Sequence, residues 1–371
     1  MANLLQKIKS LLKPALPLEP GFHAFHTPPE EPYQYRLHLR VEPDGEGVLI
    51  VNASSVLHLN QTATETVYHF IRGKQPGEIA EIISGRYSTT TEQALMDLNN
   101  FQTQLEGFIR KSDQEPVTNF GFERHSDTTD ISAPYRLDIC LNQSADTTEE
   151  TQSGLNTEVM KAAIKKCYDD GIPHIIFYGD EPTRREDLPE LLETAEKLGL
   201  VTGLVSCGEK LSSPAYVEKM ISCGLDHLIV PLTLDDLHTR GTLKVILPLD
   251  LYTSVALLVD RSFDYGIFLR ELINDGANAF AFVPGNEEFE PLCKELSDFI
   301  SEQGIALNSD MPLDKCFISA TQAASQDDDF VRMTLTCDGL IRFGGPQARV
   351  AGDFIKEEWN AIWARRFEEQ I

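Results

Sequence analysis

The last two thirds of the chain alternate short apolar runs with longer stretches in which apolar residues recur every three or four positions. The first pattern is typical of buried strands and the second of helices that pack on one face. Strands are predicted at residues 135–141, 174–178, 200–206, 227–232, 254–259 and 279–283, and helices at residues 156–170, 185–198, 214–223, 264–275 and 289–303. The alternation predicts an α/β fold on a parallel sheet that helices cover on both faces.

Residues 35–111 carry a different order, with strands first and helices afterwards. Alternating segments at 36–41 and 47–52 flank a Pro-Asp-Gly turn, which predicts a hairpin, and residues 55–59 are a third short strand. Helical patterns follow at residues 62–72, 76–84 and 90–109. This order predicts a small winged-helix-like α+β domain, and we interpret the polar residues 112–134 as a linker.

The first 34 residues divide into two parts. Apolar residues on one face of residues 3–13, beside three lysines, predict a short basic amphipathic helix that ends at Pro14. Such a helix can make contact with a membrane surface. We favour the alternative, in which it docks on the protein itself or on a partner. The six prolines within residues 14–34 predict an extended arm without regular elements.

Composition narrows the classes of function. The chain has 371 residues, of which 42% are hydrophobic, so it can bury more than one core. Its net charge of −26 repels phosphate backbones, and we therefore expect no nucleic-acid partner.

The seven cysteines are scattered, and no two lie within four residues of each other. This spacing excludes a local Cys-x-x-Cys metal site. The odd number, together with the lack of an apolar signal segment, predicts a cytoplasmic location in which most cysteines are small core residues.

Several segments that follow the predicted strands resemble the radical S-adenosylmethionine (radical SAM) enzymes over residues 135–285. They are the run from Gly179-Asp-Glu-Pro182 to Leu188, Val205-Ser-Cys-Gly208, the strand at 225–232 and the turn His238-Thr-Arg-Gly241. In that family Gly-Gly-Glu-Pro contacts S-adenosylmethionine. The resemblance implies a partial (β/α)6 barrel of the radical SAM type at residues 135–305. It also implies a residual ligand site formed by Gly179, Asp180, Glu181, Pro182 and Ser206.

One mark of the family is missing after the first strand. The family carries Cys-x3-Cys-x2-Cys there, and the three thiolates hold an iron–sulfur cluster. Residues 142–155 contain no cysteine, and Cys140 lies within the strand, where we interpret it as a core thiol. We therefore expect no catalytic residue, no metal ligand and no cofactor, in particular no 4Fe-4S cluster. S-adenosylmethionine binding is the lesser alternative.

The small domain resembles the PqqD-like family, also called the RiPP recognition element. The resemblance rests on Leu59-Asn-Gln-Thr-Ala63, on Gly73 after the first helix, and on Gly77-Glu-Ile-Ala-Glu-Ile82. Family members bind the leader of a precursor peptide as an added strand. The resemblance implies that peptide contacts come from an edge strand and from the third helix, namely Ser55, Val56, Leu57, His58, Leu98, Phe101 and Leu105. The alternative is that the three helix residues only fill the core of the domain.

The last part of the chain, residues 306–371, resembles a SPASM or twitch extension. The resemblance rests on a hairpin at 335–343 that turns at Asp338-Gly339 and on a closing helix at 355–363. Such extensions bind auxiliary clusters through cysteines. Only Cys316 and Cys337 remain in this segment, so we expect no auxiliary cluster.

The leading hypothesis is a non-catalytic, radical-SAM-like protein that binds a precursor peptide. It could also partner an active radical SAM enzyme in peptide modification. One alternative is an enzyme that binds S-adenosylmethionine or another small ligand at the barrel mouth without an iron–sulfur cluster. Another alternative is a structural subunit of a larger complex. The sequence leaves the question of catalysis open, with a preference for no activity.

Overall fold

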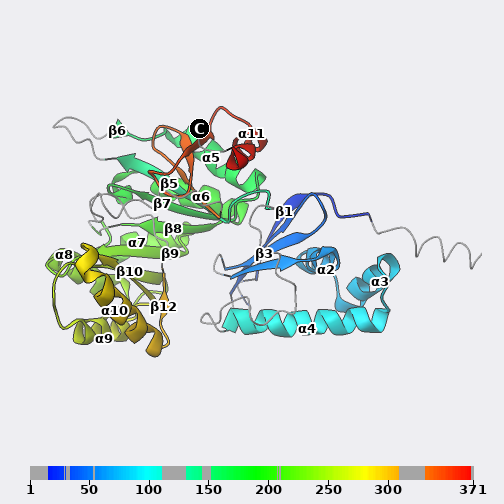
Figure 1. The fold of residues 1–371 in the computed structure, drawn as a ribbon, viewed down its shortest axis with the longest axis horizontal. Coiled ribbons are helices and arrows are strands. Elements are labelled where there is room, and N and C mark those ends of the chain that lie inside the picture. Colours follow the sequence, from blue (N-terminus) through cyan, green and yellow to red (C-terminus); the bar gives the residue numbers. More distant parts are fainter. Residues whose placement is uncertain are drawn as a thin grey trace, which may run out of the picture. The chain divides into compact units, whose positions relative to one another are not determined.

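The computed structural model describes residues 16–28, 30, 34–52, 55–110, 131–143, 152–206, 208, 210–308 and 331–368. The chain forms two compact units, Met1–Ser132 and Ala133–Ile371. Figure 1 shows the first unit in blue to cyan and the second in green to red. Some sequence-based expectations fall outside the described residues: the helix at 3–13, most of the predicted linker, the loop at 144–151, Cys207 and Cys316.

The smaller unit holds an antiparallel sheet in the order β1-β2-β3-β4. Its elements are β1 (Gly21–His26), β2 (Arg36–Val41), β3 (Gly47–Val51), β4 (Ser55–Leu59), α2 (Gln61–Ile71), α3 (Pro76–Arg86) and α4 (Thr91–Arg110). The predicted hairpin, third strand and helices are confirmed. The expectation of an arm without regular elements is wrong for β1, because its residues pair with β2 along their whole length. The likeness to a winged helix stays a prediction.

The core of this unit follows from the strand period of two residues. Leu37, Leu39, Leu49 and Leu57 occupy alternate strand positions and pack in one buried cluster with α2, α3 and α4. Helix α2 begins where the sequence offers a cap, since Asn60 Oδ1 accepts a hydrogen bond of 2.9 Å from the Ala63 amide.

The larger unit is built on one eleven-stranded sheet. Its strands are β5 (Arg136–Gln143), β6 (Gln152–Ser153), β7 (His174–Gly179), β8 (Val201–Val205), β9 (His227–Leu232), β10 (Tyr252–Val259), β11 (Ala279–Pro284), β12 (Ala306–Leu307), β13 (Arg332–Leu335), β14 (Leu340–Phe343) and β15 (Val350–Asp353). Its helices are α5 (Thr157–Asp169), α6 (Leu188–Leu198), α7 (Pro214–Ser222), α8 (Leu237–Ile246), α9 (Tyr265–Asp275), α10 (Glu290–Glu302) and α11 (Trp359–Ala364). Strand β5 and strands β7 to β12 pair in parallel, which confirms the predicted α/β class. The closure into a partial barrel stays a prediction.

Helix α8 was missed from the sequence, because His238–Gly241 was expected to form a turn. These residues lie within the helix instead. Asp236 starts it, with Oδ1 accepting from the Thr239 amide at 2.9 Å, and a Cβ on Gly241 would meet no atom within 4 Å. The glycine is thus tolerated in the helix and does not end it.

The carboxyl-terminal segment extends the parallel sheet past β5. Strand β13 pairs in parallel with β5, and β14 and β15 follow in antiparallel order. The predicted hairpin turn at Asp338-Gly339 is confirmed, and Gly339 has a φ of +90°. The closing helix starts at Trp359, later than predicted.

A polar cluster lies at the amino edge of the parallel sheet, where β5, β7 and β9 begin. The Arg136 guanidinium lies 2.8 Å from Asp138, which is 1% exposed. His174 and His227 share a hydrogen bond of 2.8 Å between their Nε2 atoms. Gly203 makes room for this pair, because a Cβ there would lie 2.2 Å from the His227 ring. Burial and the positive charge of Arg136 lower the pKa of His227 to about 4.

Candidate functional site

The turn after β7 carries a buried carboxylate at the carboxyl edge of the sheet. Glu181 is 3% exposed. Its Oε1 accepts hydrogen bonds from the Thr183 amide at 3.0 Å, from the Thr183 hydroxyl, and from the Ser206 hydroxyl at 2.8 Å. The structure thus brings together Glu181 and Ser206, two of the residues predicted for a ligand site. Pro182 begins a short 3-10 turn beside them.

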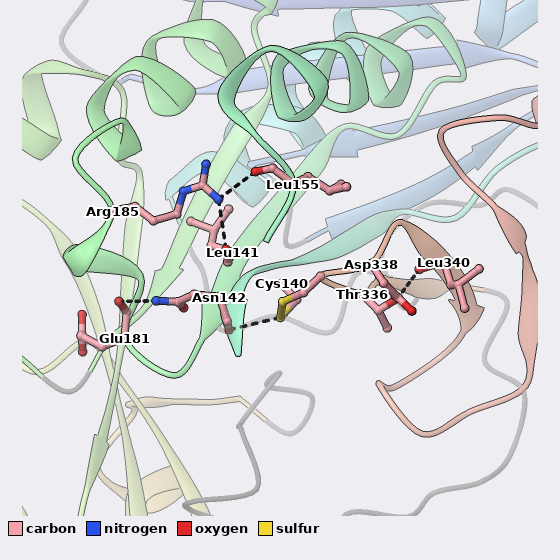
Figure 2. The surroundings of a disulfide bond; sticks show 10 residues. Cys140, Leu141, Asn142, Leu155, Glu181, Arg185, Thr336, Asp338 and Leu340 are labelled. Atoms are coloured by element: carbon pink, nitrogen blue, oxygen red, sulfur yellow. Dashed lines mark hydrogen bonds between the residues drawn. A yellow bond between two sulfur atoms is a disulfide. The ribbon is translucent and has the colours of Figure 1, made fainter. Parts of the chain in front are cut away.

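Asn142 at the end of β5 fixes the backbone of this turn (Figure 2). Its Nδ2 donates to the Glu181 carbonyl at 2.9 Å, and its own carbonyl accepts from the Asp180 amide at 3.2 Å. Gly179 has a φ of +148°, and a Cβ there would lie 2.4 Å from both oxygens of Asn142. Only glycine fits at this position.

Asp180, by contrast, stands where the family has a second glycine. Its carboxylate turns toward Arg184, 3.0 Å away. The side chain therefore finds a partner on its own turn.

Arg185 links the segments next to this turn through hydrogen bonds. It donates to the carbonyls of Leu141 and Leu155 at 3.1 and 3.0 Å, as Figure 2 shows, and to Asp187 at 2.7 Å. The bond from Arg185 to Asp187, together with one from Thr157, holds the pKa of Asp187 below its usual range. The geometry makes Arg185 a structural clamp between the end of β5 and the start of α6.

Three buried polar atoms around Glu181 have no hydrogen-bond partner among the described residues: Asn142 Oδ1, the Tyr216 hydroxyl and Thr242 Oγ1. Asn142 and Thr242 are 5% and 1% exposed. A buried polar atom without a partner destabilises a fold by about 1–3 kcal/mol. Because three of them gather near one buried carboxylate, we treat this edge as the candidate ligand site.

Two of these side chains are linked to Glu181 through electrostatics or through Ser206. Burial and the nearby Glu181 carboxylate raise the pKa of Tyr216 to about 12, so its hydroxyl keeps its proton and can donate. Thr242 lies beside Gly208, whose amide donates to the Ser206 hydroxyl at 3.3 Å. No local pattern in the sequence pointed to Asn142, Tyr216 or Thr242, since they come from β5, α7 and α8.

Cys140 lies two residues before Asn142 on β5. Its side chain is 8% exposed and belongs to a buried cluster with Ile176 and Tyr178. The expected burial is confirmed, but the interpretation as a free core thiol is wrong: Cys140 forms a disulfide with Cys337.

The residues predicted for peptide binding lie in the smaller unit. Strand β4, which contains Ser55, Val56, Leu57 and His58, pairs only with β3 and forms one edge of the described sheet. Val56 and His58 are partly exposed, whereas Leu57 is buried. The three residues of α4 are buried in the core, with exposed fractions of 1%, 6% and 2% for Leu98, Phe101 and Leu105. Their role in peptide binding stays a prediction, and it rests more on the β4 edge than on α4.

No family model matches the chain. Curated relatives match over short segments. PqqA peptide cyclase of Rhizobium meliloti is 34% identical over 98 residues, which cover 26% of this chain and 24% of the relative. The same enzyme of Gluconobacter oxydans is 30% identical over 115 residues, 31% of this chain and 30% of the relative. Fe-coproporphyrin III synthase of Methanosarcina barkeri is 36% identical over 93 residues, 25% of this chain and 23% of the relative. The matched segment thus spans less than a third of each relative.

Among solved structures, SuiB of Streptococcus suis shares the fold. The complex with its precursor peptide SuiA has a TM-score of 0.55 at 14% identity and covers 88% of this chain and 86% of SuiB. The complex with S-adenosylmethionine has the same TM-score and identity, and covers 92% and 88%. The sequence relatives match short segments only, and the SuiB comparison shows a shared mixed α/β fold with a parallel sheet, as expected from the motifs that resemble the radical SAM superfamily.

These relatives contradict the expectation of no cofactor. Enzymes of the superfamily normally use a 4Fe-4S cluster and S-adenosylmethionine, and a SuiB structure contains S-adenosylmethionine. The expectation was wrong because it extended a missing cysteine motif to the whole cofactor site. Within the described residues, no group of three or more His, Cys, Asp and Glu side chains could hold a metal ion. We therefore assign none of the described residues to a cluster.

In the described part of the chain, no helix combines the length and the apolar character needed to cross a membrane. The expected membrane-surface contact of residues 3–13 lies outside that part. The cytoplasmic location and the lack of a nucleic-acid partner stay predictions.

Proposed function

We propose that this protein binds S-adenosylmethionine at the carboxyl edge of its parallel sheet and a precursor peptide at its smaller unit, and acts in peptide modification. The observation that carries the proposal is the set of three unpartnered polar atoms around the buried Glu181. The relatives add support, since they are named as a peptide cyclase and as a protein solved with a precursor peptide.

The chemistry of the site matches the amino-acid group and the ribose of S-adenosylmethionine. Asn142 Oδ1 and the Glu181 carboxylate are acceptors, which suit the ammonium group of the ligand. The hydroxyls of Tyr216 and Thr242 can donate to its carboxylate or to its ribose oxygens. When bound, S-adenosylmethionine supplies an activated group for transfer. The residues of this chain bind and orient it.

Calorimetric titration of the full chain with S-adenosylmethionine tests this site. Loss of one hydrogen bond in Tyr216→Phe is expected to weaken binding about three- to tenfold. Tyr252→Phe is the matched control, because Tyr252 is 40% exposed at the start of β10, away from the carboxyl edge. Equal affinity of Tyr216→Phe and the wild type, or no binding to the wild type, would contradict the proposal.

The peptide is proposed to add as a strand beside β4. This strand has a neighbour on one side only among the described residues, so its other side offers backbone groups for pairing. Selection of short peptides encoded in the source genome, followed by hydrogen exchange of the complex, tests the proposal. Amides of β4 should exchange at least about tenfold more slowly with bound peptide, and amides of β1, at the other edge, should not change. Protection confined to β1 would place the peptide elsewhere.

A second function is presentation of the peptide to a separate radical SAM enzyme. It is favoured by the bond between Cys140 on β5 and Cys337 in the β13–β14 turn, because a sulfur held in a disulfide is not a cluster ligand. The two functions differ in a reconstituted reaction. If this chain and S-adenosylmethionine modify the selected peptide without another enzyme, the presenting role is excluded.

A further inference from the structure

Two cysteines that are far apart in the sequence meet beside the proposed ligand site. Cys140 on β5 and Cys337 in the β13–β14 turn are 197 residues apart and form a disulfide, with Cα atoms 5.1 Å apart. Figure 2 shows the Cys140 sulfur directed toward the turn that carries Thr336 and Asp338. The strands themselves bring the two residues together, because β13 pairs in parallel with β5 just before each cysteine.

The pair differs from the other described cysteines. Cys167, Cys223 and Cys293 are buried and free, and burial raises the pKa of each thiol. A buried, protonated thiol reacts slowly. Cys337 is only partly buried, so a small thiol or disulfide can reach the pair from its side.

One residue, Asn142, lies between the disulfide and the Glu181 turn. The Cys140 sulfur lies 3.4 Å from the Asn142 carbonyl oxygen, which also accepts the Asp180 amide. The Asn142 side chain in turn donates to the Glu181 carbonyl. The ladder between β5 and β7 has a register shift at this point, between Cys140 and Asn142, so the regular pairing is already interrupted beside the disulfide.

We propose that Cys140 and Cys337 form a redox modification site that controls ligand affinity at the carboxyl edge. The oxidised pair fixes the end of β5, and with it Asn142, in the geometry that binds S-adenosylmethionine. Reduction frees the Cys337 turn and the end of β5, and the affinity falls. The inference rests on the proposed function of the Glu181 site.

The reaction is thiol–disulfide exchange with a low-molecular-weight disulfide such as oxidised glutathione. One cysteine thiolate attacks the small disulfide, forms a mixed disulfide and releases one small thiolate. The second cysteine thiolate attacks the protein sulfur of the mixed disulfide and releases the other. The two cysteines are oxidised by two electrons, the small disulfide is reduced to two thiols, and these take the two protons.

The test uses the full chain, equilibrated with either oxidised or reduced glutathione. Peptide mapping of the oxidised sample should find the Cys140–Cys337 bond. Titration with S-adenosylmethionine should show binding about fivefold or more tighter in the oxidised sample, the lower range of coupling between sites. Cys337→Ser should lose this redox response, and the control Cys223→Ser should keep it.

Several results would overturn the inference. They are the absence of the bond after oxidation, equal affinity of the wild type in both states, and stoichiometric iron bound to the reduced pair. Hydrogen exchange at the Asp180 amide separates this inference from the proposed function, since it needs no ligand. If S-adenosylmethionine binds in neither state, the proposed function fails. Faster exchange of the Asp180 amide after reduction then still supports the redox site, and unchanged exchange rejects it.

Discussion

The two edges of the same parallel sheet differ in the partners of their buried polar side chains. At the amino edge, Arg136 pairs with Asp138 and His174 pairs with His227. At the carboxyl edge, hydrogen-bonding atoms of Asn142, Tyr216 and Thr242 stay without partners among the described residues. Under the proposed function, the amino edge uses its polar groups within the fold, whereas the carboxyl edge keeps hydrogen-bonding atoms for a ligand. Equivalent substitutions at the two edges should therefore change different properties.

The largest effect is expected from Asp138→Asn at the amino edge. The change leaves the buried Arg136 charge without its partner, so the free energy of unfolding should fall by about 3 kcal/mol. The matched change at the carboxyl edge is Asp180→Asn. Because the partner of Asp180, Arg184, is largely exposed, this variant should lose less than about 1 kcal/mol of unfolding free energy. Urea denaturation measures both. Similar losses for the two variants would break the comparison between the edges.

Gly203→Ala should destabilise the protein without a specific effect on the ligand. The new Cβ would lie 2.2 Å from the His227 ring, and such overpacking costs about 1–3 kcal/mol. Gly241→Ala is the control, since a Cβ there meets no atom within 4 Å and alanine favours a helix. Thermal denaturation should separate the two variants. The S-adenosylmethionine affinity of folded Gly203→Ala should equal that of the wild type, and weaker binding would mean that the amino edge is not purely structural.

Acid should weaken the amino edge through His227. Its pKa is lowered to about 4 in the folded state by burial and by Arg136, against about 6.5 in the unfolded chain. The unfolded state therefore takes up the proton first as the pH falls, so the stability present above pH 6.5 declines toward pH 4. Between pH 7 and pH 5 the expected loss is about 1–2 kcal/mol.

His227→Gln isolates this contribution from other groups, because glutamine does not titrate. Urea denaturation of both proteins at pH 7 and pH 5 gives the difference. The variant should lose less stability on acidification than the wild type. An equal loss would show that His227 is not the group that titrates.

Most of the fold could be predicted because its signals are local. Apolar runs, helical periodicity and glycines after helices mark the strands and helices of the larger unit within a few residues. Helix α8 was the exception, since Gly241 suggested a turn and the cap at Asp236 outweighs it. The β1 strand was also missed, because the prolines around it suggested an arm, and its pairing with β2 is a contact beyond the local sequence.

The candidate site could be predicted only in part, for a related reason. Glu181 and Ser206 follow strands within recognisable motifs, so the sequence pointed to them. Tyr216 and Thr242 come from two helices, and only the packing of the fold brings these side chains into the neighbourhood of Glu181 and Ser206. The Cys140–Cys337 bond depends on β13 joining β5, a pairing across 197 residues that no spacing in the sequence reveals.

The smallest effect on stability, and the sharpest comparison, comes from two threonines of α8. Thr239 and Thr242 are each 1% exposed. The Thr239 hydroxyl donates to Asp236 at 2.6 Å, whereas Thr242 Oγ1 has no partner among the described residues. Thr242→Val should leave stability unchanged or raise it by up to about 1 kcal/mol, and Thr239→Val should lower it by about 1 kcal/mol.

Ligand binding should respond in the opposite order. Thr242→Val should weaken S-adenosylmethionine binding about three- to tenfold, because the hydroxyl meant for the ligand is gone, and Thr239→Val should not. Denaturation measures the stability of each variant, and calorimetry measures its affinity for S-adenosylmethionine. A loss of stability in Thr242→Val without a loss of affinity would show that its hydroxyl serves the fold, and the distinction between the two edges would then fail at its most direct point.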